Sequence, residues 1–140
     1  MRLGVRATLV AGRIIEGDVA IDNGVIEVVG LSPAGKSGLA VPGFIDVQIN
    51  GFDGVDFTTA EAEDYERVGR RLAATGVTSF QPTLITLPSP DYLPVLERLR
   101  STSIKSARIL GMHLEGPFLS PVRCGAHDPQ NMLEPNLVLT

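Results

Sequence analysis

The chain has 140 residues, of which 44% are hydrophobic and 20% are charged, a globular composition that excludes disordered and fibrous proteins. Twelve basic and 16 acidic side chains give a formal charge of −4. The chain therefore has no basic character of the kind that binds nucleic acid, and we expect no nucleic-acid partner. No apolar run approaches the roughly 20 residues of a membrane span, so we expect no membrane partner. The single cysteine, Cys124, cannot form an internal disulfide, which favours the cytoplasm.

Residues 1–40 contain short β-like runs and predict strands of a small sheet. Four of these runs lie at 7–10, 13–16, 18–21 and 25–29. Asp22-Asn23-Gly24 tolerates positive φ and predicts a tight hairpin between the last two. The stretch 31–38 is rich in Gly, Ser and Pro, so we predict a loop there and a domain boundary near residue 40.

The remaining residues alternate between apolar strand-like runs and helical patterns. Strands are predicted at 44–50, 79–86 and 108–115, with a helix in each of the two intervals. The intervals are long enough for crossover connections between parallel strands, so the pattern predicts an α/β layered architecture.

The first helix is predicted to begin at a capping box formed by Thr58 and Glu61 and to end before Gly76. Three apolar residues share one face of this helix: Tyr65, Val68 and Leu72.

The second helix is predicted to be capped by Asp91, with Pro94 in its first turn, where no backbone hydrogen bond is lost. Three leucines lie along this helix at helical spacing: Leu93, Leu96 and Leu99.

Polar side chains gather where the three apolar strands end. They are Gln48 and Asn50, Thr83 and Thr86, and His113 and Glu115. Because the carboxyl ends of parallel strands meet at one edge of a sheet, we expect these groups to lie together there, where α/β proteins place their functional sites.

Glu115 is the sharpest candidate of this set, because a carboxylate directly after a buried strand is costly unless something compensates its charge. It is either a ligand of a divalent metal ion or a structural glutamate that pairs with an arginine or with backbone amides. The residue pattern leaves both interpretations open.

Other residues near Glu115 also have two interpretations. His113 lies two residues earlier and is either a second ligand or a packed histidine that bonds to the backbone. Gln48 and Asn50 are amides, poor ligands for a transition metal, and hydrogen-bond water, substrate or neighbouring ligands, or else their own loop. His127 follows in a turn-rich loop and either reaches a ligand over the site or is simply solvated.

Three ordered motifs resemble the N-acetylglucosamine-6-phosphate deacetylases of the amidohydrolase superfamily. They are V-P-G-F-I-D-V-Q-I-N-G at 41–51, P-T-L-I-T at 82–86 and H-L-E-G-P-F-L at 113–119. The resemblance implies the start of a (β/α)8 TIM-like barrel over 41–140, preceded by strands of a small β-sandwich over 1–40. Such a barrel needs about 250 residues, so it would be incomplete here.

The resemblance also implies an activity and roles for individual residues. The family hydrolyses the acetamide of N-acetylglucosamine 6-phosphate to give glucosamine 6-phosphate and acetate, using a divalent metal ion, often zinc. Glu115 matches its metal ligand, and Ala126 and His127 match its substrate-contacting pair, of which the histidine polarises the amide carbonyl. Gln48-x-Asn50 matches the branch without a His-x-His pair, which implies one metal ion per site, with Gln48, Asn50 and His113 in supporting positions.

The resemblance places the catalytic aspartate beyond Thr140, so we expect no catalytic residue within the chain. We therefore expect a fragment that is inactive alone, whose parent binds an amino-sugar phosphate and forms a homo-oligomer. Two alternatives remain at this point. One is an amidohydrolase of cyclic amides or ureas, and the other is a non-catalytic chain that persists by pairing with itself or a partner.

Overall fold

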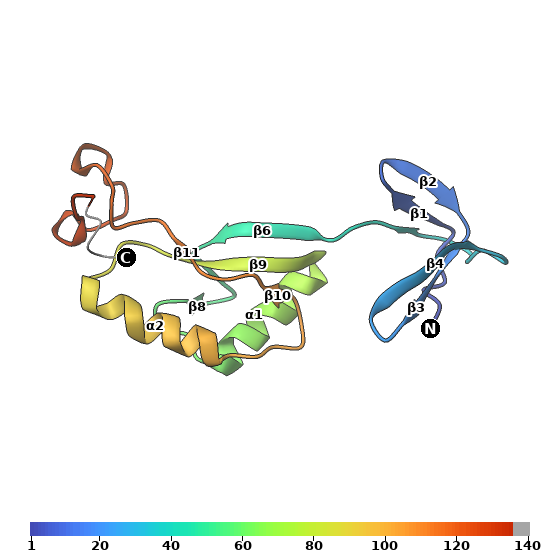
Figure 1. The fold of residues 1–140 in the computed structure, drawn as a ribbon, viewed down its shortest axis with the longest axis horizontal. Helices are drawn as coiled ribbons and strands as arrows, with labels where there is room; N and C mark the ends of the chain where they lie inside the picture. The colour runs from blue at the N-terminus through green and yellow to red at the C-terminus, as the bar shows by residue number, and fades with distance from the viewer. Residues whose placement is uncertain (136–140) are drawn as a thin grey trace. The chain divides into compact units, whose positions relative to one another are not determined.

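The computed structural model describes residues 1–135 and divides the chain into two compact units, Met1–Pro42 and Gly43–Thr140. Figure 1 shows a mixed α/β chain, with strands alone in the first unit and strands and helices in the second. Residues 136–140 and the expected catalytic aspartate lie outside the described residues.

The first unit contains five strands in two small sheets. In one sheet, β1 (Ala7–Val10) lies between β2 (Arg13–Glu16), which is antiparallel to it, and β5 (Leu39–Ala40), which is parallel. In the other, β3 (Asp18–Asp22) pairs with β4 (Val25–Leu31) in an antiparallel hairpin. Asn23 and Gly24 turn this hairpin with φ values of 47° and 78°, which confirms the predicted turn.

The second unit is built on a parallel sheet with β9 (Val77–Leu84) at its centre. β6 (Phe44–Ile49) pairs with one edge of β9, and β10 (Arg108–Ile109) and β11 (His113–Leu114) pair with the other. A tight hairpin of β7 (Gly51–Phe52) and β8 (Val55–Asp56) follows β6. The parallel pairing predicted for the three apolar runs is confirmed.

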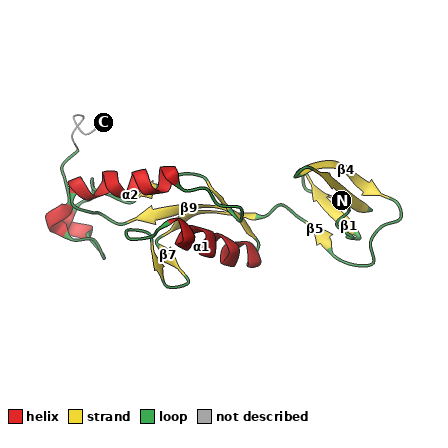
Figure 2. Cartoon of the chain, turned by 90° about the horizontal axis from the view of Figure 1, so that it is seen from below, coloured by secondary structure: helices red, strands yellow, loops and turns green. Residues whose placement is uncertain are grey.

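Two helices lie on the same side of this sheet (Figure 1), with β9 running between them when seen from below (Figure 2). They are α1 (Ala62–Ala74) and α2 (Ser89–Ser101). Two short 3-10 turns, η1 (Pro121–Arg123) and η2 (Pro129–Asn131), follow β11. The order β6–α1–β9–α2–β10/β11 is the repeated strand–helix–strand arrangement of α/β proteins.

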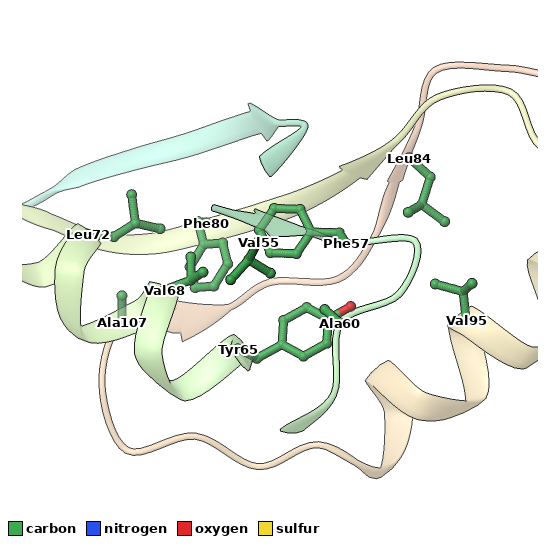
Figure 3. Packing of buried hydrophobic residues seen from close by; sticks show 10 residues of the cluster. All are labelled: Val55, Phe57, Ala60, Tyr65, Val68, Leu72, Phe80, Leu84, Val95 and Ala107. Atoms are coloured by element: carbon green, nitrogen blue, oxygen red, sulfur yellow. The ribbon is translucent and has the colours of Figure 1, made fainter. Parts of the chain in front are cut away.

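The core of this unit lies between the helices and the sheet, as Figure 3 shows. The ring of Phe57 stacks on Tyr65 of α1, with 5.5 Å between the centroids, and lies 6.5 Å from Phe80 of β9. The buried cluster comprises Val55, Phe57, Ala60, Tyr65, Val68, Leu72, Phe80, Leu84, Val95 and Ala107. The predicted apolar face of α1 is therefore the face that packs.

Both predicted helix starts were wrong by a few residues. The N-cap of α1 is Glu61, whose backbone N–H donates to the Asp64 carboxylate over 3.1 Å. Thr58 is instead held by Asp56, which accepts hydrogen bonds from its N–H at 2.9 Å and its hydroxyl at 2.8 Å. A local turn therefore takes the side chain that the motif assigned to the cap.

Helix α2 begins two residues before Asp91, so Pro94 lies inside the helix and not in its first turn. Pro90 occupies the start, where a missing N–H costs nothing. Val95 is the buried residue of this helix, whereas Leu93 is 62% exposed.

The third predicted strand, 108–115, is interrupted. Its two pieces both pair with β9, but the register slips by one residue between Ile109↔Phe80 and His113↔Thr83. Gly111, with φ of 142°, lies in the interruption. This is a local bulge next to the segment that carries Glu115.

Candidate functional site

Three of the polar residues predicted to meet at the carboxyl edge of the sheet, Gln48, Asn50 and Glu115, do meet there. Gln48 is the penultimate residue of β6 and Asn50 follows that strand, whereas Glu115 comes directly after β11. The backbone N–H of Glu115 donates to Leu84 O over 3.0 Å. This hydrogen bond extends the pairing with β9 and holds the backbone of Glu115 at the end of the sheet.

Glu115 is the residue on which the others converge. Gln48 Nε2 donates to its Oε1, and Asn50 Nδ2 donates to its Oε2 over 3.0 Å. His127 Nε2 lies 3.6 Å from the same Oε2. The Glu115 and His127 side chains are 20% and 14% exposed, so solvent reaches this carboxylate only partly. The two amide contacts join residues that are 67 and 65 positions apart in the sequence.

His127 reaches the site from the loop after η1. Its N–H donates to Cys124 O over 3.0 Å, closing a turn in which Gly125 takes a φ of 58° that glycine adopts without strain. The Nδ1 atom of the ring accepts from the backbone N–H of Thr86 at 3.0 Å and lies 2.9 Å from the Thr86 hydroxyl. Ala126, predicted to contact substrate, is exposed in the same turn.

His113 does not join the group around Glu115 among the described contacts. Its Nδ1 lies 3.1 Å from Val47 O, so the histidine bonds to the backbone of β6. Of the two sequence interpretations, this contact corresponds to the packed histidine. Thr83 also bonds to the backbone of β6. Its hydroxyl accepts from Ile49 N–H over 3.0 Å, at the point where the β6–β9 register shifts.

The contact between Thr86 and His127 was not anticipated from the sequence. Thr86 stood out only as a polar residue at a strand end, within the P-T-L-I-T motif. Sequence alone could not pair it with a histidine 41 residues later in a loop, because no periodic pattern relates the two positions.

The donor set of the site is one carboxylate, one imidazole and two amides. Carboxylate and imidazole are groups that bind divalent transition metals, so Glu115 fits the role of one ligand. Within residues 1–135, no group of three His, Cys, Asp or Glu side chains is placed to hold a metal ion.

Comparison with known proteins gives consistent results in sequence and in structure. No family model matches the chain. The N-acetylglucosamine-6-phosphate deacetylase of Rattus norvegicus is 49% identical over 94 residues, which are 64% of this chain and 23% of the rat protein. The deacetylases of Caenorhabditis elegans and Bacillus subtilis are 44% and 36% identical, each over 69% of this chain and 26% of their own length. The matches thus span about a quarter of these curated relatives.

Solved structures of the same enzyme are similar over nearly the whole chain. The deacetylase of Thermotoga maritima superimposes with a TM-score of 0.84 at 28% identity, covering 99% of this chain and 38% of the bacterial chain. A variant from Mycobacterium smegmatis, solved in complex with N-acetyl-D-glucosamine-6-phosphate, gives a TM-score of 0.78 at 28% identity over 96% of this chain and 37% of its own. The predicted resemblance to these deacetylases is confirmed, for the N-terminal part of their length.

Proposed function

We propose that the chain is part of a metal-dependent amide hydrolase that converts N-acetylglucosamine 6-phosphate and water into glucosamine 6-phosphate and acetate. The observation that carries the proposal is the convergence of Gln48, Asn50 and His127 on Glu115, in a chain similar to deacetylases of this substrate. In this proposal residues 1–40 are strands of a β-sandwich and residues 41–140 are the first units of a (β/α)8 barrel.

Glu115 would hold one divalent metal ion, which we propose to be zinc. A bound divalent ion supplies two things to amide hydrolysis, a bound water of lowered pKa and polarisation of the carbonyl. Gln48 and Asn50 donate to the two oxygens of Glu115 and so orient the carboxylate, which limits the directions in which it can bind an ion.

His127 and Ala126 would contact the substrate from their shared turn. His127 Nε2 lies 3.6 Å from Glu115 Oε2, so a carbonyl oxygen placed next to the carboxylate is within reach of the ring. We propose that His127 donates a hydrogen bond to the amide carbonyl, which stabilises the negative charge that develops on that oxygen during hydrolysis. Transfer of a proton to the leaving amine is assigned to an aspartate outside the described residues.

Several further properties belong to the same proposal. The enzyme acts in the cytoplasm on a soluble amino-sugar phosphate and forms a homo-oligomer. No helix of the described part is long and apolar enough to cross a bilayer. The 140 residues by themselves release no acetate in this proposal, because Glu115 is a single ligand and a catalytic metal site uses about three protein ligands.

The test replaces Glu115 in the parent enzyme, the protein that contains these residues and releases acetate. Glu115→Gln keeps the size of the side chain and removes its charge, and we expect kcat for acetate release to fall by about 100-fold or more together with loss of bound zinc. Glu97→Gln, on the exposed face of α2, is the matched control and should retain both. Acetate release and metal content per protein are the measured quantities.

Three outcomes would overturn the proposal. Unchanged turnover and metal content in Glu115→Gln would remove Glu115 from the metal site. A parent enzyme that opens cyclic amides and leaves N-acetylglucosamine 6-phosphate intact would place the chain with another amidohydrolase. A 140-residue chain that forms a stable oligomer of fixed size and unfolds cooperatively would indicate a non-catalytic role.

A further inference from the structure

Thr86 holds the ring of His127 through two contacts to one atom. Its backbone N–H donates to His127 Nδ1 over 3.0 Å, and its hydroxyl oxygen lies 2.9 Å from the same nitrogen. Thr86 is 3% exposed, so water does not compete for these contacts. Both donors come from the loop after β9, whereas the ring comes from the loop after η1.

These contacts determine which ring nitrogen carries the proton. A neutral imidazole has one N–H donor and one acceptor, and a backbone N–H can only donate. The Nδ1 atom must therefore be the acceptor, and the proton of the neutral ring lies on Nε2, the atom that faces Glu115 Oε2 at 3.6 Å. The Thr86 hydroxyl can add a second donor to Nδ1 but cannot accept from it.

We propose that Thr86 is a positioning residue, which fixes His127 with its proton on Nε2 and so presents an N–H donor at the Glu115 carboxylate. The assignment of the proton stands on the geometry alone. Its use on a substrate carbonyl rests on the proposed function, where a ring with the opposite tautomer would offer a lone pair to the carbonyl and could not polarise it.

The surroundings of Thr86 hold it in this place. A Cβ added at Gly116 would lie 2.0 Å from the Thr86 hydroxyl oxygen, so the segment after Glu115 passes directly over this side chain. On the other side, the next N–H in the chain, that of Leu87, donates to the Tyr92 hydroxyl of α2 over 3.0 Å. The donor pair is thus fixed by the folded chain before any ligand binds.

The second histidine of the chain provides an internal comparison. His113 Nδ1 lies 3.1 Å from Val47 O, and a carbonyl can only accept. His113 must therefore carry its proton on Nδ1, the opposite assignment to that of His127. The chain has only these two histidines, so one spectrum reports both.

The experiment is nitrogen NMR of the 15N-labelled 140-residue chain at about pH 8, where an ordinary histidine is neutral. We expect a pyrrole-type Nε2 and a pyridine-type Nδ1 for His127, and the reverse for His113. A scalar coupling across the hydrogen bond should join the Thr86 amide nitrogen to His127 Nδ1. A proton on His127 Nδ1, or the absence of this coupling, would overturn the proposal.

Two variants test the side chain of Thr86. Thr86→Val keeps the branched shape and the backbone N–H but removes the hydroxyl, and we expect His127 Nδ1 to remain pyridine-type but its nitrogen resonance to shift, because it loses one of its two donors. Thr86→Ser restores the hydroxyl and should restore the wild-type values, whereas His113 should stay unchanged in both. Identical His127 spectra for Thr86→Val and wild type would overturn the part assigned to the hydroxyl.

Neither measurement needs substrate or metal, so its failure is separable from failure of the proposed deacetylase activity. A wrong tautomer in a chain whose parent releases acetate would overturn only the role of Thr86. The predicted tautomer in a protein without this activity would leave the positioning intact and remove its proposed use on a carbonyl.

Discussion

Asp18 is a carboxylate at 3% exposure in the first unit. Burial alone would raise its pKa, but hydrogen bonds from Val19 N–H, the Arg2 side chain and Val5 N–H outweigh burial and hold the pKa below its ordinary value of 3.8. A carboxylate with a lowered folded-state pKa stabilises the fold above its unfolded-state pKa, and this contribution is lost as the pH falls through the folded-state value.

We therefore expect Asp18→Asn to be less stable than wild type at pH 7, with a difference that shrinks toward about pH 3. The measurement is the urea midpoint of unfolding at a series of pH values. Asp22→Asn, at the exposed end of the same strand, is the control and should differ little from wild type. A gap between Asp18→Asn and wild type that does not depend on pH would contradict this account.

Tyr65 carries a hydroxyl that is buried without a hydrogen-bond partner among residues 1–135. Burial raises its pKa to about 12. For a tyrosine with a raised folded-state pKa, the stabilisation is complete below the unfolded value of about 10 and is lost as the pH rises from there toward 12.

At pH 7, the free energy of unfolding of Tyr65→Phe should equal or exceed that of wild type, or fall below it by less than about 1 kcal/mol, because no hydrogen bond is lost. Tyr92→Phe is the matched variant and should lose about 1 kcal/mol, because the Leu87 N–H loses its acceptor. Urea unfolding followed by circular dichroism measures both. A larger loss in Tyr65→Phe than in Tyr92→Phe would show that the Tyr65 hydroxyl has a partner.

At the scale of elements, helix α1 begins at a cap other than the one predicted from the sequence. The Thr58/Glu61 motif predicted the cap, whereas the structure uses Glu61 and Asp64, which have the same three-residue spacing. Asp64 also pairs with Arg67 at 3.0 Å and lies in the first turn, where a negative charge is favourable.

Replacing Asp64 by alanine should therefore lower the free energy of unfolding by about 1 kcal/mol. Glu63→Ala removes the same charge from the same turn and leaves the Glu61 N–H bonded to Asp64, so it should cost clearly less. Thermal unfolding of the two variants side by side gives the comparison. Equal losses would assign the effect to charge alone and reject the cap.

The sequence patterns located most elements but not all their limits. The hairpin at Asn23-Gly24 and the buried face of α1 were predictable, because turn chemistry and helical periodicity are local properties. The interruption of 108–115 was not, since an apolar run does not reveal a one-residue slip that is set by pairing with β9. The position predicted for Pro94 was also wrong, because Pro90 lies at the start of α2 and Pro94 therefore falls inside the helix.

At the scale of the whole molecule, β6 is an edge strand of the described sheet with large apolar side chains exposed. Phe44, Ile45 and Val47 are 71%, 62% and 58% exposed. An exposed apolar edge strand promotes association between chains. We expect the 140-residue chain to associate at raised concentration.

Val47→Lys should reduce this association, because a charge on an edge strand opposes pairing with another chain. Val122→Lys is the control, since Val122 is 90% exposed but lies outside the sheet. Light scattering at matched concentrations compares the three proteins. Equal scattering by Val47→Lys and wild type would exclude the β6 edge as the surface of association.

The sequence by itself determined the α/β alternation, the resemblance to the deacetylases and the identity of the polar residues at the strand ends, because these depend on local pattern and on motifs. Only the tertiary structure decided which of those residues touch. Gln48, Asn50 and His127 converge on Glu115, Thr86 occupies His127 Nδ1, and His113 turns to the backbone of β6. The physical reason is that contacts between loops depend on strand register and on the bulge before Glu115, which only the packed sheet fixes.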